Sequence, residues 1–236
     1  MAVKTKCFRA VLLSSTLCTG LLFNSCGSRQ PEQPATRTVS TSTAAPQKVS
    51  PADTRPVVVA FGDSLTAGYG VEPGKSYPDF LQHRLDAAGY KYHVVNLGVS
   101  GDTTTDGVQR LPDVIAARPV LVILEFGGND GLRGLPVSTT RANLAQMIQT
   151  LQKAGVRILL AGMTLPRNYG QAYIYSFEQV FVSLARQFHL PSIPFLLEGV
   201  GGHPDLTQSD GIHPTAQGCE IVSGNVMKYL APLLKK

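Results

Sequence analysis

The chain has 236 residues, 43% of them hydrophobic, and carries 21 Lys and Arg against 16 Asp and Glu, for a formal net charge of +5. The excess positive charge lies before Pro56, because the residues from Pro56 on contain 14 basic and 14 acidic side chains. A balanced domain has no basic stripe to follow a phosphate backbone, and the chain has no Trp to stack on bases, so we exclude a nucleic-acid partner. The composition also excludes collagen, coiled coils and wholly disordered chains, and it predicts one globular domain over residues 56–236.

Residues 1–25 have the pattern of a secretory signal peptide. Lys4, Lys6 and Arg9 precede an apolar run of 14 residues that ends at Phe23. The run is shorter than the roughly 20 apolar residues that span a bilayer. We therefore predict a signal peptide and no retained membrane helix.

Cys26 directly follows this pattern and is the candidate site of lipidation. The segment Phe23-Asn24-Ser25-Cys26 resembles a bacterial lipobox, although that pattern prefers Leu where Phe23 stands and a small residue where Asn24 stands. Plain secretion and an incidental cysteine are the alternatives. Residues 26–55 consist mainly of Ser, Thr, Pro, Gln and Ala, which cannot form a core, so we expect a disordered linker. The protein is expected to be exported, and either to be held at the periplasmic face of the cell envelope by its N-terminal lipid alone or to be secreted.

From Pro56 on, short apolar runs alternate with longer amphipathic stretches. The runs are rich in β-branched residues and predict strands at residues 57–61, 92–96, 121–125, 156–161 and 192–195. The stretches between and after them predict helices at residues 77–88, 104–117, 140–154, 174–188 and 214–234. Such alternation predicts an α/β fold, with a parallel sheet covered by helices.

Four polar, glycine-rich clusters follow predicted strands. In an open parallel sheet, ligands bind beyond the carboxyl ends of the strands, so we expect these clusters to meet at one edge. They are Gly62-Asp63-Ser64-Leu65-Thr66, Gly98-Val99-Ser100-Gly101-Asp102, Gly127-Gly128-Asn129-Asp130 and Asp210-Gly211-Ile212-His213-Pro214.

The clusters contain the parts of a nucleophilic site. A serine hydroxyl becomes a nucleophile when an imidazole takes its proton and a carboxylate orients that imidazole. Ser64, His213 and Asp210 suit these three roles. The negative oxygen formed on attack needs donors already aimed at it, and the backbone N–H groups of Ser64 and Gly98 with the side-chain amide of Asn129 are candidates for this oxyanion hole.

The four blocks, in this order, resemble those of the SGNH (GDSL) hydrolase superfamily. Further segments, including Asn168-Tyr169-Gly170, are similar to its bacterial arylesterase and lysophospholipase group, that of multifunctional acyl-CoA thioesterase I, over residues 57–234. The resemblance implies a three-layer α/β/α fold with five parallel strands in the flavodoxin-like order 2-1-3-4-5. It implies Ser64 as nucleophile, Asp210 and His213 as its partners, Gly98 and Asn129 in the oxyanion hole, and neither a metal nor a cofactor. We expect a monomer.

The same resemblance locates an acyl pocket. Residues 131–137 and 168–175 should flank it, with apolar walls from Leu132, Leu135, Val137 and Tyr173. Thr105-Asp106 and Arg167 depart from the family pattern, since relatives often have small residues and a second Pro there. We expect these departures at the mouth of the site, where they would affect substrate preference.

The sequence therefore predicts a serine esterase that forms an acyl-enzyme on Ser64. Its substrates would be carboxylic or thio esters, including aryl esters, with short to medium acyl chains, and lysophospholipids are further candidates. A carbohydrate or cell-wall O-acetyl esterase and a non-catalytic envelope-binding protein are the alternatives. Gly74-Lys75-Ser76 imitates a phosphate-binding loop, but position 69 holds Tyr69 where that loop needs Gly.

Overall fold

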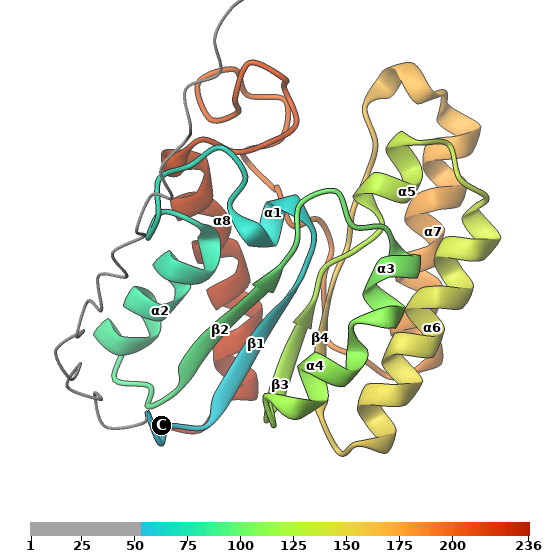
Figure 1. Ribbon diagram of the computed structural model, residues 1–236. Helices are drawn as coiled ribbons and strands as arrows, with labels where there is room; N and C mark the ends of the chain where they lie inside the picture. Colours follow the sequence, from blue (N-terminus) through green and yellow to red (C-terminus); the bar gives the residue numbers. More distant parts are fainter. Residues whose placement is uncertain (1–52) are drawn as a thin grey trace, which may run out of the picture. The chain divides into compact units, whose positions relative to one another are not determined.

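A five-stranded parallel sheet forms the centre of the domain (Figure 1). The computed structural model describes residues 53–236, so the predicted signal peptide, Cys26 and most of the predicted linker lie outside the described residues. The strands are β1 (Val57–Gly62), β2 (His93–Gly98), β3 (Leu121–Leu124), β4 (Arg157–Ala161) and β5 (Ser192–Ile193). Their order is β2-β1-β3-β4-β5, which confirms the predicted α/β fold and its flavodoxin-like strand order.

Helices cover both faces of this sheet and make the three predicted layers (Figure 1). One face carries α2 (Tyr77–Ala87) and α8 (Ala216–Leu230). The other carries α3 (Thr104–Gln109), α4 (Leu111–Ala116), α6 (Val137–Lys153) and α7 (Gln171–Gln187). Within residues 53–236, no helix combines the length and the apolar character that crossing a bilayer requires.

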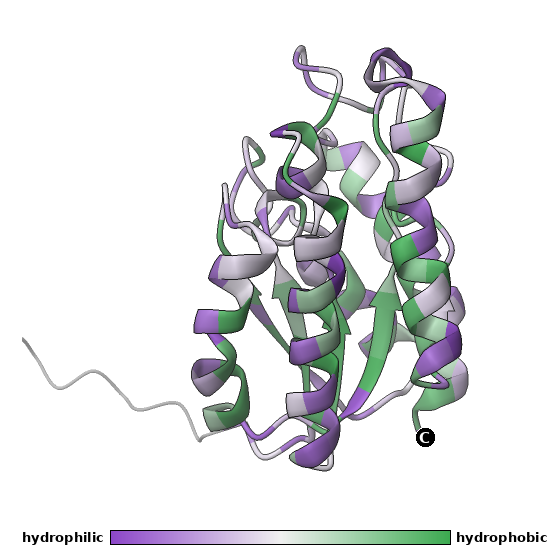
Figure 2. Cartoon of the chain, turned by 90° about the vertical axis from the view of Figure 1, so that its right-hand side faces the viewer, coloured by the Kyte–Doolittle hydropathy of each residue, from purple (hydrophilic) through white to green (hydrophobic). Residues whose placement is uncertain are grey.

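The core follows from the position of each strand in the sheet. The central strands β1 and β3 are covered on both faces, and residues 58–61 and 121–124 are fully buried. The edge strand β2 is only half-buried, which matches its more polar sequence. Figure 2 shows the strands as largely hydrophobic, whereas the helices mix hydrophobic and hydrophilic residues, as expected for elements with one face toward the core.

Proline accounts for two differences from the predicted helices. The single helix expected over residues 104–117 is divided at Arg110 into α3 and α4, because Pro112 has no N–H to continue the helix and its ring would clash with the preceding turn. The last helix begins at Ala216 rather than at Pro214, and the Thr215 side chain caps it by accepting from the Gly218 N–H at 3.2 Å. The short helices α1 (Ser64–Ala67) and α5 (Gly128–Leu132) were not expected, and both start in the glycine-rich clusters.

Candidate active site

Ser64 is the first residue of α1 and follows β1 after a single intervening residue, Asp63. The Asp63 carboxylate caps the short helix by accepting from the Leu65 N–H at 3.1 Å. The preceding turn needs glycine, since a Cβ at Gly62 would lie 2.2 Å from Thr66 Oγ1 and 2.3 Å from a carboxylate oxygen of Glu125. The turn therefore holds Ser64 at the carboxyl edge of the sheet.

The structure brings together the three residues predicted to form the triad. His213 Nε2 lies 2.8 Å from Ser64 Oγ, and His213 Nδ1 lies 2.6 Å from Asp210 Oδ2. A proton on Nδ1 that points at Asp210 leaves Nε2 as the acceptor for the Ser64 hydroxyl. The geometry required for activation of a serine nucleophile is thus present before any substrate binds.

The turn before α8 supports this arrangement. Burial by itself would raise the pKa of Asp210, but hydrogen bonds from the His213 ring and from the His213 and Ile212 backbone N–H groups together lower it to about 2. The carboxylate thus stays ionised at neutral pH and can stabilise a protonated imidazole. The Tyr69 ring lies against the His213 ring, with centroids 4.7 Å apart.

Asn129, the third position in the Gly127–Asp130 cluster, lies beside Asp63. Its Nδ2 donates to Asp63 Oδ2 at 3.2 Å and to the Asp102 carbonyl at 2.9 Å. The two bonds fix the amide between the nucleophile turn and the loop after β2. Asp63 thus caps α1 and Asp102 anchors the loop after β2. The Asp102 carboxylate also forms an ion pair with Arg110 at 2.6 Å.

The backbone N–H of Gly98, predicted to serve in the oxyanion hole, already has an acceptor. Gly98 is the last residue of β2, and its N–H donates to Asn96 Oδ1 at 2.9 Å. Glycine is needed at this position for packing, because a Cβ would lie 2.2 Å from the Ala67 backbone nitrogen. Gly101, three residues later, belongs to the loop that Asn129 contacts through Asp102, and its N–H has no acceptor among residues 53–236.

A buried acidic network behind Ser64 was missed by the sequence analysis. Glu125 is completely buried, and its Oε2 accepts from the Asp63 N–H at 3.1 Å and the Thr66 hydroxyl at 2.8 Å. Its Oε1 has no hydrogen-bond partner among the described residues. Burial raises the pKa of both Glu125 and Asp63, and the charge of the nearby Asp63 raises that of Glu125 further. A strand-terminal Glu is common, so only the packing around it could reveal this network.

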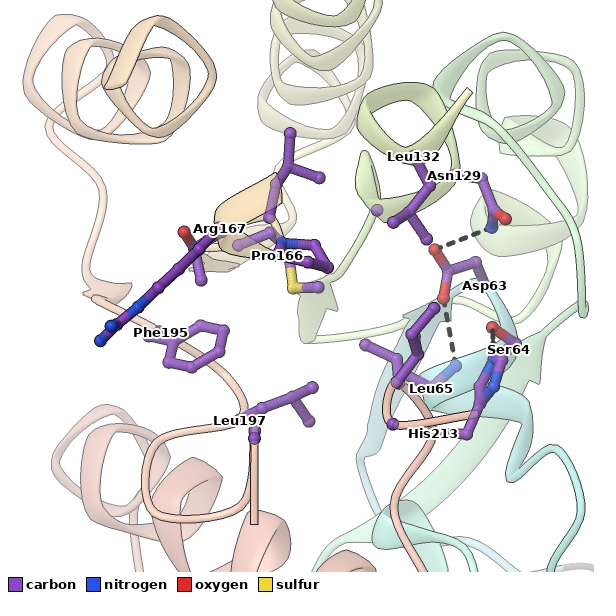
Figure 3. A pocket seen from close by; sticks show the side chains of 18 residues that line it. Asp63, Ser64, Leu65, Asn129, Leu132, Pro166, Arg167, Phe195, Leu197 and His213 are labelled. Carbon is purple, nitrogen blue, oxygen red and sulfur yellow. Dashed lines mark hydrogen bonds between the residues drawn. The ribbon is translucent and has the colours of Figure 1, made fainter. Parts of the chain in front are cut away.

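A cavity of about 440 Å³ opens from Ser64 and His213 (Figure 3). Its wall is mainly apolar, and the larger apolar side chains in it are Leu65, Leu132, Met163, Leu165, Pro166, Phe195, Leu197 and Ile212. These come from the nucleophile turn, α5, the segments after β4 and β5, and the turn before α8. The volume is within the range of small-molecule sites, roughly 300–1,000 Å³.

The cavity corrects most of the predicted pocket wall. Leu132 lines it, whereas Leu135, Val137 and Tyr173 do not. Val137 begins α6, and the Tyr173 hydroxyl donates to the Leu135 carbonyl at 3.1 Å, so these residues shape the loop behind the wall. The segments after β4 and β5 replace them, because parallel strands bring their carboxyl ends to the same edge.

The residues that depart from the family pattern occupy two different places. Thr105 and Asp106 do not line the cavity. The Asp106 carboxylate accepts from the Thr103 N–H at 2.8 Å and caps α3, and Thr105 Oγ1 accepts from Asn143 Nδ2 at 3.0 Å. Arg167 does line the cavity, so it alone of the three is placed to affect substrate preference.

Among residues 53–236, no three His, Cys, Asp or Glu side chains cluster in a way that could hold a metal ion. Cys219 is buried in α8. The absence of a cofactor stays a prediction.

Comparisons with known proteins show which proteins the chain is similar to. Residues 60–221 match the sequence model of the GDSL-like lipase/acylhydrolase family. The chain is 43% identical to esterase TesA of Pseudomonas aeruginosa over 178 residues, which cover 75% of this chain and 89% of that protein. It is 36% identical to thioesterase 1/protease 1/lysophospholipase L1 of Escherichia coli K12, covering 75% and 84%. A crystal structure of TesA superposes with a TM-score of 0.73 at 42% identity, covering 75% of this chain and 99% of that one.

Proposed function

The chain belongs to the GDSL-like lipase/acylhydrolase family and is a serine ester hydrolase, and we propose that it acts by acyl transfer to Ser64. Ser64 Oγ attacks the ester carbonyl carbon while its proton moves to His213 Nε2. The tetrahedral intermediate then collapses and its bond to the leaving group breaks, at the alcohol oxygen of an ester or the thiol sulfur of a thioester. His213 gives its proton to this oxygen or sulfur. Water then attacks the acyl carbonyl carbon while His213 Nε2 takes one of its protons. The bond from this carbon to Ser64 Oγ breaks, His213 returns the proton to Oγ, and the carboxylic acid leaves.

Three donors are proposed for the oxyanion of each tetrahedral intermediate: the Ser64 N–H, the Gly101 N–H and the Asn129 amide. Gly101 takes the place first expected for Gly98, because the Gly98 N–H already has Asn96 as its partner. Without substrate, Asn129 Nδ2 already donates to two acceptors, the Asp63 carboxylate and the Asp102 carbonyl. An oxyanion would replace the Asp63 carboxylate, whose bond of 3.2 Å is the longer of the two. Such bonds often shorten or exchange only when substrate is bound.

The substrates proposed are carboxylic or thio esters with short to medium acyl chains. The observation that carries this proposal is the Ser64–His213–Asp210 relay at one end of an apolar cavity of about 440 Å³. An apolar wall of this extent favours substrates with several methylene groups over acetyl esters. The names of the relatives, which include an esterase, a thioesterase and a lysophospholipase, agree with this class.

A chain-length series tests the proposed substrate class. The rate of hydrolysis of p-nitrophenyl esters from acetate to palmitate should peak at about four to ten acyl carbons, because each further buried methylene adds affinity until the acyl chain fills the cavity. Ser64→Ala is the control for background hydrolysis. Activity confined to acetate would support an O-acetyl esterase instead, and no activity in either protein would contradict the esterase proposal.

We also propose that the enzyme is exported and anchored through a lipid on Cys26, with residues 26–55 as the tether. The support is the basic and apolar pattern before Cys26. In fractionated bacterial cells expressing the full chain, Cys26→Ala should move the protein from the membrane to the soluble fraction. Cys18→Ala, within the apolar run, is the matched control. Equal membrane shares for Cys26→Ala and the unchanged protein would reject the anchor.

A further inference from the structure

Among residues 53–236, Arg167 is the one basic residue apart from His213 in the wall of the catalytic cavity. It begins the short helix η1 (Arg167–Tyr169) after β4, and the Tyr169 hydroxyl fixes this helix by donating to the Leu132 carbonyl at 2.8 Å. Figure 3 shows Arg167 beside Phe195, on the side of the cavity opposite Ser64, with its guanidinium group directed away from the serine. A defined backbone turn therefore places a cation at the far end of an apolar wall.

The charge of Arg167 is not neutralised within the described part of the chain. Its side chain is exposed and makes no hydrogen bond or ion pair with any of residues 53–236. Arg110, by contrast, is held by Asp102 and by the Leu97 and Gly62 carbonyls. Asp63, the only acidic residue that the described part of the chain contributes to the cavity wall, is buried and already accepts from Leu65 and Asn129. Arg167 therefore has five free donors for a ligand in the cavity.

We propose that Arg167 binds an anionic group, a carboxylate or a phosphate, on the part of the ester that occupies the cavity. The planar guanidinium fork matches both groups and can bind either in a bidentate manner. Phe195 and Leu197 provide apolar surface between this cation and the serine (Figure 3). The preferred substrate would thus be amphipathic, with its ester at Ser64 and its anion separated from that ester by apolar carbons.

This inference rests on the proposed esterase function, and its test uses pairs of esters that differ by one anionic group. The first pair, p-nitrophenyl hexanoate and mono-p-nitrophenyl adipate, places the anion on the acyl part. The second, 1-octanoylglycerol and 1-octanoylglycerol 3-phosphate, places it on the alcohol part. Each pair is hydrolysed by the unchanged protein, by Arg167→Gln and by Arg167→Glu. Arg186→Gln is the matched control, because Arg186 on α7 is exposed, does not line the cavity and has no side-chain partner among residues 53–236.

In at least one pair, Arg167→Gln should lower kcat/KM for the anionic ester about 5- to 20-fold, mainly by raising KM. It should change kcat/KM for the neutral ester by less than twofold. Arg167→Glu should lower kcat/KM for the anionic ester further, and Arg186→Gln should leave the ratio unchanged. Because the guanidinium is exposed, the preference should also weaken as salt is raised. The pair that responds identifies whether the anion lies on the acyl or the alcohol part.

Two outcomes overturn the inference and are distinguishable. If neutral esters are hydrolysed but the anionic-to-neutral ratio changes by less than twofold in both pairs and both Arg167 variants, Arg167 does not bind an anion. If the unchanged protein hydrolyses no ester in either pair faster than Ser64→Ala, the proposed esterase function fails, and the inference fails with it.

Discussion

Replacing Ser64 by alanine is expected to lower kcat/KM for a medium-chain p-nitrophenyl ester by at least about 10⁴-fold. The hydroxyl is the group that would form the covalent intermediate, and it lies 2.8 Å from His213 Nε2. His213→Ala should cause a loss of similar size, because a serine without its base remains a neutral and weak nucleophile. Steady-state kinetics on both variants, with circular dichroism to show that they fold, provides the measurement.

The double variant tests whether the two residues act as one unit. Ser64→Ala/His213→Ala should be no slower than the worse single variant within about threefold, since removing either member already disables the relay. His203→Ala is the control, because this histidine is exposed and lies outside the cavity. Losses that multiply in the double variant, or a Ser64→Ala variant within tenfold of the unchanged protein, would contradict the proposed relay.

The sequence predicted the sheet well because parallel strands buried on both faces leave a strong local signal. The runs at residues 57–61 and 121–125 contain almost only large apolar residues, and β1 and β3 fall there. The strand order was predicted from the resemblance to a family, because the hydrophobic pattern of a strand does not indicate which strands pair with it. Helix ends were less accurate, because α3 and α4 are divided by one proline whose effect depends on the local turn.

The site was predictable where chemistry is tied to a local motif. Asp210 and His213 lie three residues apart in one turn, and the sheet brings this turn to Ser64 at the start of α1. Sequence alone could not choose between Gly98 and Gly101 as oxyanion donor, because one ends β2 and the other follows it within three residues. Only the hydrogen bond from the Gly98 N–H to Asn96 separates the packing glycine from the candidate donor.

The pocket wall was the least predictable part. Leu135 follows the Asn129 cluster closely in sequence, and the family resemblance placed Tyr173 near the same site. Both residues nevertheless pack behind the cavity wall, where the Tyr173 hydroxyl donates to the Leu135 carbonyl. Met163 and Phe195 follow different strands and meet only in the folded sheet. Long-range packing of this kind has no signature in a single local segment.

Replacing Glu125 is expected to change the stability of the fold in a way that depends on pH. The carboxyl is completely buried, its Oε1 has no partner among residues 53–236, and burial raises its pKa well above the ordinary value, with the nearby Asp63 charge raising it further. Hydrogen bonds from Thr66 and from the Asp63 N–H oppose this rise without cancelling it. The folded protein therefore keeps a proton on Glu125 at pH values where the unfolded chain has lost it.

The direction of the pH effect follows from this difference in bound protons. Where the folded state binds more protons than the unfolded state, the free energy of unfolding falls as pH rises. For Glu125 the fall begins near its unfolded pKa of about 4.3 and continues until the raised folded pKa is passed, with a slope of roughly 1.4 kcal/mol per pH unit. Asp63, whose pKa burial also raises, contributes a fall of the same sign.

Glu125→Gln removes this proton while keeping the shape of the side chain. Its amide oxygen can still accept from Asp63 and Thr66, but its NH₂ group would be buried where Oε1 now has no partner. The variant should therefore be less stable than the unchanged protein at pH 5, by about 1–3 kcal/mol. That deficit should shrink or reverse by pH 8, because the unchanged protein alone must then either bury a charge or take up a proton.

Urea unfolding at pH 5, 6, 7 and 8 measures this difference directly. Glu198→Gln is the matched control, since Glu198 is exposed and its variant should follow the unchanged protein at every pH. Subtracting the curves cancels the titrating groups that do not contact Glu125, including Asp210, whose lowered pKa acts only in more acidic solution. Asp63 remains in the difference, because its pKa depends on Glu125. A constant difference between Glu125→Gln and the unchanged protein would mean that Glu125 ionises equally in both states. In that case some group would have to donate a hydrogen bond to Glu125 Oε1 in the folded protein, and folding would not raise the pKa of Glu125.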